Sequence, residues 1–511
     1  MKTTMKTTIK TILTFFILSG LVVTVQAQVP DMKMTTPIPT SVSTPDKVET
    51  SIGTLNFFDG VPTTETVEKS YAFLDKMNAV KVFQAMLPSM SINELRDGQA
   101  SLGAKEAHQI CIFDNLMDSK SLVLTGNTST MYALGFLDLK KDGPTVVELP
   151  QGMLGVFNDM SFLFMENLGA AGPDKGKGGK YLVLPPGYDG EIPSGYYVIK
   201  SRTYGVWNFM RGYLDNGVKA ASDNIRNNLK VYPLSQKDKQ PTMEFINASG
   251  KEMNTIVPAD YSFYTKLHKL VQDEPVDFMD GETRGVMRSI GIEKGKPFNP
   301  DARMKTILDD AVKIAEGIAR TVTYYPREKG QFAWEDISSG WVVPFAEHDS
   351  SWKTEDGTRK IEMQMYYHYN CIVVTPAMAR APGPGKGSEY VFKSFDSEDK
   401  ILLGAQNYKM TLPANVPVAD FWAITLYDTQ TRSQLQTDQK FPTLDTYTKG
   451  LKKNKDGSIT MYFGHKAPKG KESNWLQTVP GKSFFVCLRM YGPTQPWIDG
   501  VWRPSTVELV K

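Results

Sequence analysis

The sequence predicts an α+β protein with two antiparallel β-rich domains, sandwich or jelly-roll-like, a helical N-terminal part and a helical region between them. Short runs of β-branched and aromatic residues, separated by Gly, Pro and Asp, occupy Ser121 to Lys200, and this spacing is typical of antiparallel sheets. Similar runs fill the chain after about Thr358. Helical periodicity marks Thr64 to Leu87 and much of Val218 to Val322.

The N-terminal helical part is predicted as two helices. From Thr64 to Met77 apolar residues recur at helical spacing, and Pro62 suits the position ahead of a helix. A second helix, from Ala79 to Leu87, is expected to stop at Pro88, because proline removes a helical hydrogen bond.

The first β-rich part contains five predicted strands: Leu122 to Leu124, Tyr132 to Leu139, Thr145 to Leu149, Tyr181 to Leu184 and Tyr196 to Lys200. The clearest helix of the middle region is expected to begin at Asn299 as N-cap, with Pro300 at its first position and Asp301 near the positive helix end. Its apolar stripe continues to Val322.

The C-terminal part is predicted to be strand-like throughout: Ile361 to Tyr369, Glu389 to Phe392, Phe421 to Tyr427, Ile459 to Phe463, Phe484 to Tyr491 and Thr506 to Val510. Alternation along the third of these runs puts Phe421 and Tyr427 on one face and Trp422 on the other.

The N-terminus has the layout of a secretory signal peptide. Lys2, Lys6 and Lys10 precede an apolar run from Ile12 to Val25, and Ala27 offers a small residue before the expected cut. The run is shorter than the roughly 20 residues that cross a bilayer, and no later segment is long enough, so the protein is predicted to be exported to the periplasm or the medium and not membrane-spanning.

The predicted domain organisation is a signal peptide at 1–27, a flexible tether at 28–50, an N-terminal helical and β-rich domain at 51–205, a mainly helical connection at 206–330 and a C-terminal β-sandwich at 331–511. A net charge of +2 over 511 residues argues against a nucleic-acid partner, which needs a concentrated basic face. Cys111, Cys371 and Cys487 lie in apolar surroundings and are expected to be buried, while pairing of the last two stays open.

A resemblance to a known family adds to these patterns. Gly172 to Tyr188 is a basic glycine loop that leads into an apolar strand and a Pro-Pro-Gly turn. This segment, with Gly291 to Asp301, Phe421 to Asp428, Asn474-Trp475 and Leu488 to Pro493, resembles bacterial envelope proteins that pair the domain of unknown function numbered 1254 with the one numbered 1214. The resemblance covers the chain from about Thr50 onward, and it implies no reaction.

The loop that contains Lys175, Lys177 and Lys180 is a candidate anion site, because its glycines let backbone amides converge while the lysines supply charge. A P-loop is excluded, since the required spacing is absent and a strand follows where a helix is needed. The alternative is a solvated connection.

Thr125 to Tyr132 resembles a segment that the family usually writes Thr-Pro-Asn-x-Asp-Thr-x-Tyr. Here Gly126 replaces the proline and Ser129 the acidic residue, which puts any chemistry of that carboxylate in doubt. The polar candidates that remain are Asn127, Thr130, Tyr132 and Asp138. The alternative reading is that the Asn and Thr side chains cap a turn.

Trp422, Asn474 and Trp475 are ligand-binding candidates in the C-terminal part. They belong to a set of residue types that line ligand grooves: Trp422, Tyr427, Arg432, Asn474, Trp475, Arg489, Tyr491 and Trp502. Both faces of the strand at Phe421 to Tyr427 are largely apolar, which favours a sandwich core.

Two hypotheses of function follow, and both expect no metal and no cofactor, because the five histidines show no ligand spacing and no cofactor motif is present. The first is a protein that binds a small polar or anionic ligand in the cell envelope. The second is a metal-independent hydrolase or lyase for a small ester or sugar derivative, with Tyr132, Asp138 and Arg489 as acid, base or anion-stabilising groups. A structural homo-oligomer is a third reading.

Overall fold

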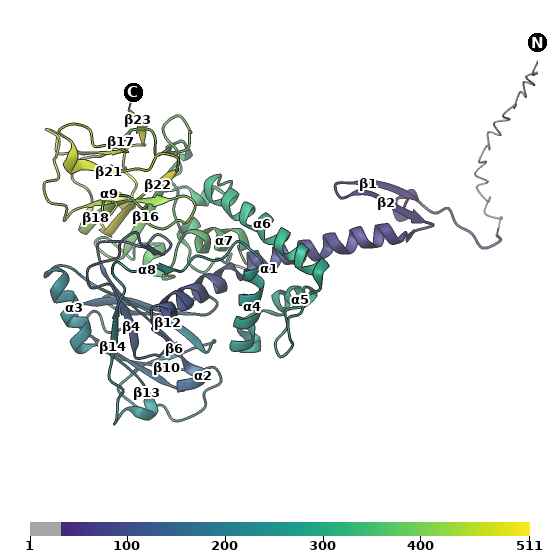
Figure 1. The fold of residues 1–511 in the computed structure, drawn as a ribbon, viewed down its shortest axis with the longest axis horizontal. Helices are drawn as coiled ribbons and strands as arrows, with labels where there is room; N and C mark the ends of the chain where they lie inside the picture. The colour runs from purple at the N-terminus through teal and green to yellow at the C-terminus, as the bar shows by residue number, and fades with distance from the viewer. Residues whose placement is uncertain (1–31, 511) are drawn as a thin grey trace, which may run out of the picture. The chain divides into compact units, whose positions relative to one another are not determined.

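The computed structural model describes residues 32–510 (Figure 1), so the predicted signal peptide lies outside the described residues. The chain divides into two compact units, one up to Ser70 and one from Tyr71 onward. In the first, strands β1 (Lys47–Thr50) and β2 (Gly53–Phe58) form an antiparallel hairpin, and β3 (Val61–Pro62) pairs with β2. Between residues 32 and 510, no helix is long and apolar enough to cross a membrane.

Helix α1 (Thr64–Ser101) is one element, so the predicted break at Pro88 is wrong. Proline in a helix interior costs about 3 kcal/mol, but the residues on both sides of Pro88 are buried in a large apolar core and offset this cost: Val82, Phe83, Met86, Leu87, Met90, Ile92 and Leu95. Arg359 donates a hydrogen bond to the carbonyl of Ala85, within one turn of the proline. Packing therefore outweighs the local signal.

The first β-rich part is a sandwich of two sheets. The larger sheet has the order β14 (Glu244–Asn247), β4 (Gln109–Ile112), β6 (Met131–Asp138), β12 (Gly205–Gly212), β8 (Met153–Asp159) and β9 (Phe164–Gly169). The smaller has the order β11 (Tyr197–Lys200), β10 (Gly179–Leu184), β7 (Thr145–Leu149) and β13 (Lys230–Pro233). Their facing side chains form one apolar core. The pairs β10/β11 and β14/β4 are parallel, so the sheets are mixed.

The C-terminal β-rich part is a second sandwich (yellow in Figure 1). One sheet has the order β16 (Ser388–Lys393), β22 (Phe484–Pro493), β18 (Val418–Asp428) and β19 (Thr443–Asp445). The other has the order β21 (Trp475–Gln477), β20 (Ile459–Gly464), β17 (Tyr408–Leu412) and β23 (Glu508–Leu509). The alternation predicted for β18 is confirmed, because Trp422, Ile424 and Leu426 enter the core of this sandwich while Phe421 and Tyr427 face the opposite way.

Helix α3 (Gly217–Asn228) lies between β12 and β13 in sequence, and helices α4 (Ser262–Asp273), α5 (Gly281–Ser289) and α6 (Ala302–Tyr324) lie between the two sandwiches. The predicted start of α6 at Asn299 is two residues early, because the N-cap is Asp301, whose carboxylate accepts a hydrogen bond from the amide of Met304 at 2.7 Å. Minor elements complete the fold: α2 (Leu139–Asp142), α8 (Pro376–Ala379), α9 (Gln495–Ile498), β5 (Ser121–Leu122) and β15 (Met253–Asn254).

The predicted strand at Ile361 to Tyr369 is wrong, because this segment is helix α7 (Ile361–Asn370). Every residue from Met363 to Asn370 is buried. A helix that is covered on all sides carries no amphipathic period, so its aromatic and apolar content mimics that of a buried strand.

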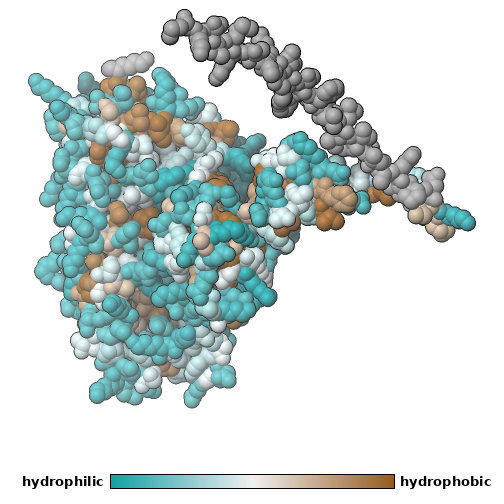
Figure 2. Space-filling model, turned by 45° about the vertical axis from the view of Figure 1, so that its right-hand side comes forward, coloured by the Kyte–Doolittle hydropathy of each residue, from teal (hydrophilic) through white to brown (hydrophobic). Residues whose placement is uncertain are grey.

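A third apolar core joins the two sandwiches within the second unit. It contains side chains of α1, α4, α6 and α7, together with the outer face of the six-stranded sheet and the outer face of β16, β18 and β22. All three cysteines are free and buried, Cys111, Cys371 and Cys487. Figure 2 shows that the face of the molecule turned to the viewer is mainly hydrophilic, with apolar residues in smaller groups. The third core brings β12 of the first sandwich close to β22 of the second, and the candidate site lies between these two strands.

Candidate functional site

Two arginines, one from each sandwich, lie at the site. Arg211 is on β12 and Arg489 on β22, and only 8% and 4% of their surfaces are exposed. Because side chains alternate along a strand, Arg211 shares its face of β12 with Phe209, and Arg489 shares its face of β22 with Tyr491. Both faces are turned toward the third core, away from the sandwich interiors.

Both arginines line a small inner cavity of about 40 Å³. Asn127, Tyr132 and Tyr390 are also part of its wall. The cavity adjoins a cleft of about 730 Å³ that lies between the sandwiches, since four residues line both spaces: Phe209, Arg211, Val373 and Met378. Arg211 therefore lies where the cavity meets the open cleft, and Arg489 lies in the wall of the cavity.

Two guanidinium nitrogens in this region have no hydrogen-bond partner among the described residues, Nε of Arg211 and Nη1 of Arg489. Arg489 does donate from Nη2 to the carbonyl of Thr125, which ties β22 to a loop of the N-terminal sandwich. Its guanidinium carbon also lies 5.4 Å from the ring centre of Tyr390. Buried polar atoms are almost always paired, so these two nitrogens mark a place where a partner is expected.

No carboxylate neutralises the pair, because neither arginine forms an ion pair within residues 32–510. The surrounding phenols do not supply negative charge either. Burial raises the pKa of Tyr132, although the nearby Arg211 and Arg489 lower it. Burial likewise raises the pKa of Tyr491 well above its ordinary value. The tyrosines are neutral near pH 7, and two buried positive charges remain unbalanced.

Asn127 organises the loop between the sandwiches. Its side-chain oxygen accepts hydrogen bonds from the amides of Ser129 at 3.0 Å and Thr130 at 3.1 Å, and its side-chain nitrogen donates to the hydroxyl of Tyr491 at 3.0 Å. The amide of Asn127 donates to the hydroxyl of Tyr132 at 3.2 Å. The predicted turn capping is present, and the same residue lines the cavity.

Some of the residues predicted from sequence converge on this place. Asn127, Tyr132 and Arg489 line the inner cavity, and Thr130 is hydrogen-bonded to Asn127. Lys175 lines the outer cleft.

Other predicted residues lie elsewhere. Asp138 caps α2 by accepting from the amides of Lys140 and Lys141, both at 3.1 Å. Trp422 is in the C-terminal sandwich core. Asn474 donates to the carbonyls of Lys452 at 2.8 Å and Thr460 at 2.9 Å, and Trp475 donates to the carbonyl of Gly464 at 2.8 Å. Lys177 and Lys180 do not line the cleft, and Lys180 pairs with Glu148 at 3.2 Å.

Sequence reasoning missed Arg211, Tyr213, Tyr390 and Lys386, which all line the cleft or the cavity. A signal for the first two exists, because Arg211-Gly-Tyr213, at the end of β12 and just beyond it, has the same Arg-x-Tyr pattern as Arg489-Met-Tyr491 on β22. In a strand this spacing puts the arginine and the tyrosine on one face.

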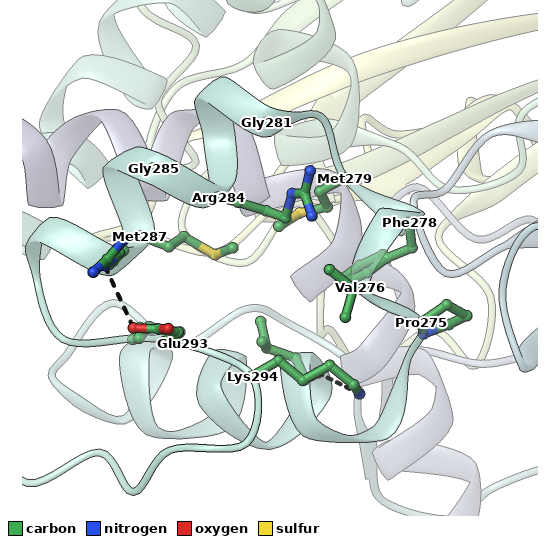
Figure 3. A pocket seen from close by; sticks show the side chains of 13 residues that line it. Pro275, Val276, Phe278, Met279, Gly281, Arg284, Gly285, Met287, Glu293 and Lys294 are labelled. Atoms are coloured by element: carbon green, nitrogen blue, oxygen red, sulfur yellow. Dashed lines mark hydrogen bonds and ion pairs between the residues drawn. The ribbon is translucent and has the colours of Figure 1, made fainter.

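A separate cavity of about 370 Å³ lies between α4 and α5 (Figure 3). Three of its charged lining residues, Arg288, Glu293 and Lys294, are engaged with their surroundings. Lys294 donates to the carbonyls of Val271 at 3.2 Å and Gln272 at 2.9 Å, which completes the C-terminal end of α4, and Arg288 pairs with Glu293 at 3.6 Å. This cavity shows no buried cation that lacks a partner among its described lining residues.

Comparison with protein families assigns both sandwiches. Residues 108–233 match the protein family of unknown function DUF1254, and residues 387–495 match the protein family of unknown function DUF1214. The chain therefore pairs the two domains, in the N- to C-terminal order that the resemblance implied. Arg211 belongs to the first domain and Arg489 to the second, so the site is formed between them.

Two solved structures were compared with this chain, and the first shares its fold. The VPA0106 protein from Vibrio parahaemolyticus is 17% identical over 86% of this chain and 100% of its own, with a TM-score of 0.52. An uncharacterized protein from Burkholderia cenocepacia is 12% identical over 88% of this chain and 97% of its own, with a TM-score of 0.39. No curated protein matches.

Proposed function

We propose that this protein binds a small anionic ligand in the cleft between its two sandwiches, with an anionic group held between Arg211 and Arg489. The observation that supports this proposal is the pair of guanidinium nitrogens without partners in the described chain. An unpaired buried charge costs several kcal/mol, and proteins retain such charges where a ligand supplies the counter-charge. The two unpaired nitrogens in one cavity wall support a preformed anion site.

The size of the inner cavity favours a carboxylate as the anionic group. A cavity needs about 10 to 15 Å³ to hold one water molecule. The inner cavity, at about 40 Å³, therefore holds roughly three heavy atoms of the size of a water oxygen. A planar carboxylate has three heavy atoms and accepts hydrogen bonds from guanidinium groups with good geometry. A tetrahedral phosphate or sulfate is larger.

The proposal includes a place of action outside the cytoplasm. The basic residues, apolar run and small residue that end at Ala27 have the layout of a signal peptide. Mass spectrometry of protein recovered from the periplasm or medium should find an N-terminus at or near Gln28. Recovery of the intact chain in the cytosol alone would reject export.

Calorimetric titration of the purified protein with a series of small carboxylic acids and their neutral amides tests the binding function. The wild type should bind carboxylates and not the matched amides. Arg211→Gln should weaken binding about 10-fold or more, because a hydrogen bond to a charged group contributes about 1.5 to 3 kcal/mol. Lys177→Gln changes the net charge equally outside the cleft and is the matched control. Equal binding of amides and carboxylates would reject the proposal.

A further inference from the structure

The two sandwiches contribute matching sequence motifs to the same cleft. Gly172-Pro-Asp-Lys-Gly176 precedes β10, and Gly383-Pro-Gly-Lys-Gly387 precedes β16. Each domain also carries one Arg-x-Tyr strand motif, as described above. Members of all four motifs line the cleft: Gly172, Lys175, Arg211, Tyr213, Gly385, Lys386, Gly387 and Tyr491. The cleft thus has Arg211 at its inner end, where it meets the cavity that Arg489 also lines, and a pair of lysines, one per domain, on loops at its wall.

The loop that carries Lys175 is fixed by a buried carboxylate. Asp174 accepts a hydrogen bond from the amide of Gly178 at 2.9 Å and one from the hydroxyl of Tyr181. Lys175 has a φ of 52°, a left-handed backbone that is uncommon for a residue with a side chain. Its side chain is exposed and has no ion pair or hydrogen bond within residues 32–510.

The loop that carries Lys386 is fixed to the end of β22. The amide of Gly385 donates to the carbonyl of Pro493 at 2.9 Å, and the amide of Gly492 donates to the carbonyl of Gly387 at 2.9 Å. Gly492 follows Tyr491 directly. The position of Lys386 is therefore coupled to the strand that carries Arg489. In the described structure the Lys386 side chain, like that of Lys175, is exposed and has no partner.

Positive side chains outnumber negative ones along the wall of the cleft. Its wall contains the cations Lys175, Arg211 and Lys386 and one carboxylate, Asp420. Partial burial and the neighbouring Asp215 raise the pKa of Asp420, which disfavours its charged form. A volume of about 730 Å³ far exceeds one carboxylate and lies in the range of about 300 to 1,000 Å³ that is usual for small-molecule sites.

We infer that the ligand is an elongated dianion, with a carboxylate between Arg211 and Arg489 and a second anionic group at Lys175 and Lys386. This inference rests on the proposed anion-binding function and adds the second anchoring point. The inner pair supplies desolvated, directional hydrogen bonds. The lysines are solvated point charges, so they add selectivity and association rate more than strength.

Calorimetric titration at low salt with linear monocarboxylates and dicarboxylates of equal chain length tests the inference. The wild type should bind the best dicarboxylate about fivefold more tightly or better than its monocarboxylate counterpart. In the double variant Lys175→Gln/Lys386→Gln this preference should fall to within about twofold, with monocarboxylate affinity retained. The control Lys177→Gln/Lys180→Gln removes two neighbouring charges that do not line the cleft, and it should keep the wild-type preference. Unchanged thermal midpoints would show that both double variants are folded.

The results separate the two levels of the proposal. Monocarboxylates that bind in an Arg211-dependent way, with no preference for dicarboxylates, would overturn the inference and leave the anion site in place. A preference that survives in the Lys175 and Lys386 variant would overturn it as well. Failure of every carboxylate to bind the wild type would overturn both the inference and the proposed function.

Discussion

The hydroxyl of Ser129 donates a hydrogen bond to the carboxylate of Asp445 at 2.9 Å. Ser129 belongs to the loop of the N-terminal sandwich that also contains Asn127, and Asp445 lies on β19 of the C-terminal sandwich. Ser129 occupies the position at which the family resemblance implies an acidic residue. In this chain a carboxylate does reach that position, but the other domain supplies it.

The variant Ser129→Asp should destabilise the protein by about 2 kcal/mol or more, because it introduces a second carboxylate beside Asp445 at a position that is only 2% exposed. Urea unfolding measures the loss. The exchanged pair Ser129→Asp/Asp445→Ser should recover most of it, since one carboxylate and one hydroxyl face each other again. Additive effects of the two substitutions would contradict the assigned contact.

Arg211 is expected to lower the stability of the ligand-free protein. Replacing a buried charge by an apolar residue of similar volume is often neutral or stabilising by about 1 to 4 kcal/mol. Arg211→Met should therefore leave the thermal midpoint unchanged or raise it, while it abolishes stabilisation by added carboxylates. A large drop in the midpoint would show that Arg211 has a structural partner and would count against an anion site.

Trp422 is expected to contribute to stability and not to ligand binding. Its side chain is 5% exposed and lies in the C-terminal core. Trp422→Ala should cost about 3 to 5 kcal/mol in the free energy of unfolding, with carboxylate affinity unchanged in the fraction that folds. A cost below about 1 kcal/mol together with weakened binding would instead place the indole at a ligand surface.

His368 should make the protein sensitive to acid. Burial lowers its pKa to about 3, whereas an unfolded chain has a histidine pKa of about 6.5. The unfolded state therefore binds the proton more tightly than the folded state. The stability that neutral His368 contributes to the folded protein is complete above about pH 6.5 and is lost as the pH falls toward 3. By pH 5 the loss is about 2 kcal/mol.

The variant His368→Gln should lack this pH dependence. The stability difference between wild type and variant, measured by urea unfolding at pH 7 and pH 5, should narrow or reverse at pH 5. The same difference at both values would show that His368 is not a buried neutral imidazole in the folded protein.

Local patterns predicted the elements that face two environments. The strand at Phe421 to Tyr427 was predictable because it is rich in aromatic and β-branched residues, and strand geometry then places alternate residues in two distinct cores. Helix α6 was predictable because one of its faces is exposed and the other packs inward. Helix α7 was not, because tertiary burial on all sides erased the period that identifies a helix.

The candidate site was predictable only in part, because it is assembled from positions far apart in the sequence. The resemblance to a family segment drew attention to Asn127 and Tyr132, and the aromatic pattern near the C-terminus to Arg489. Arg211 lies outside the segments that the family resemblance singled out, and its role depends on its apposition to Arg489 across the domain boundary. Only the two-fold occurrence of the Arg-x-Tyr and Gly-Pro-x-Lys-Gly patterns carries that information in the sequence.

The most direct test of the anion site is a crystal structure of the protein with a bromine-labelled monocarboxylate, whose position the anomalous signal of bromine reports independently. The account predicts the carboxylate in the inner cavity, with its oxygens about 2.7 to 2.9 Å from Nε of Arg211 and Nη1 of Arg489, and the bromine in the outer cleft. A carboxylate that binds in solution but occupies another place in the crystal, with both nitrogens still unpaired, would contradict it.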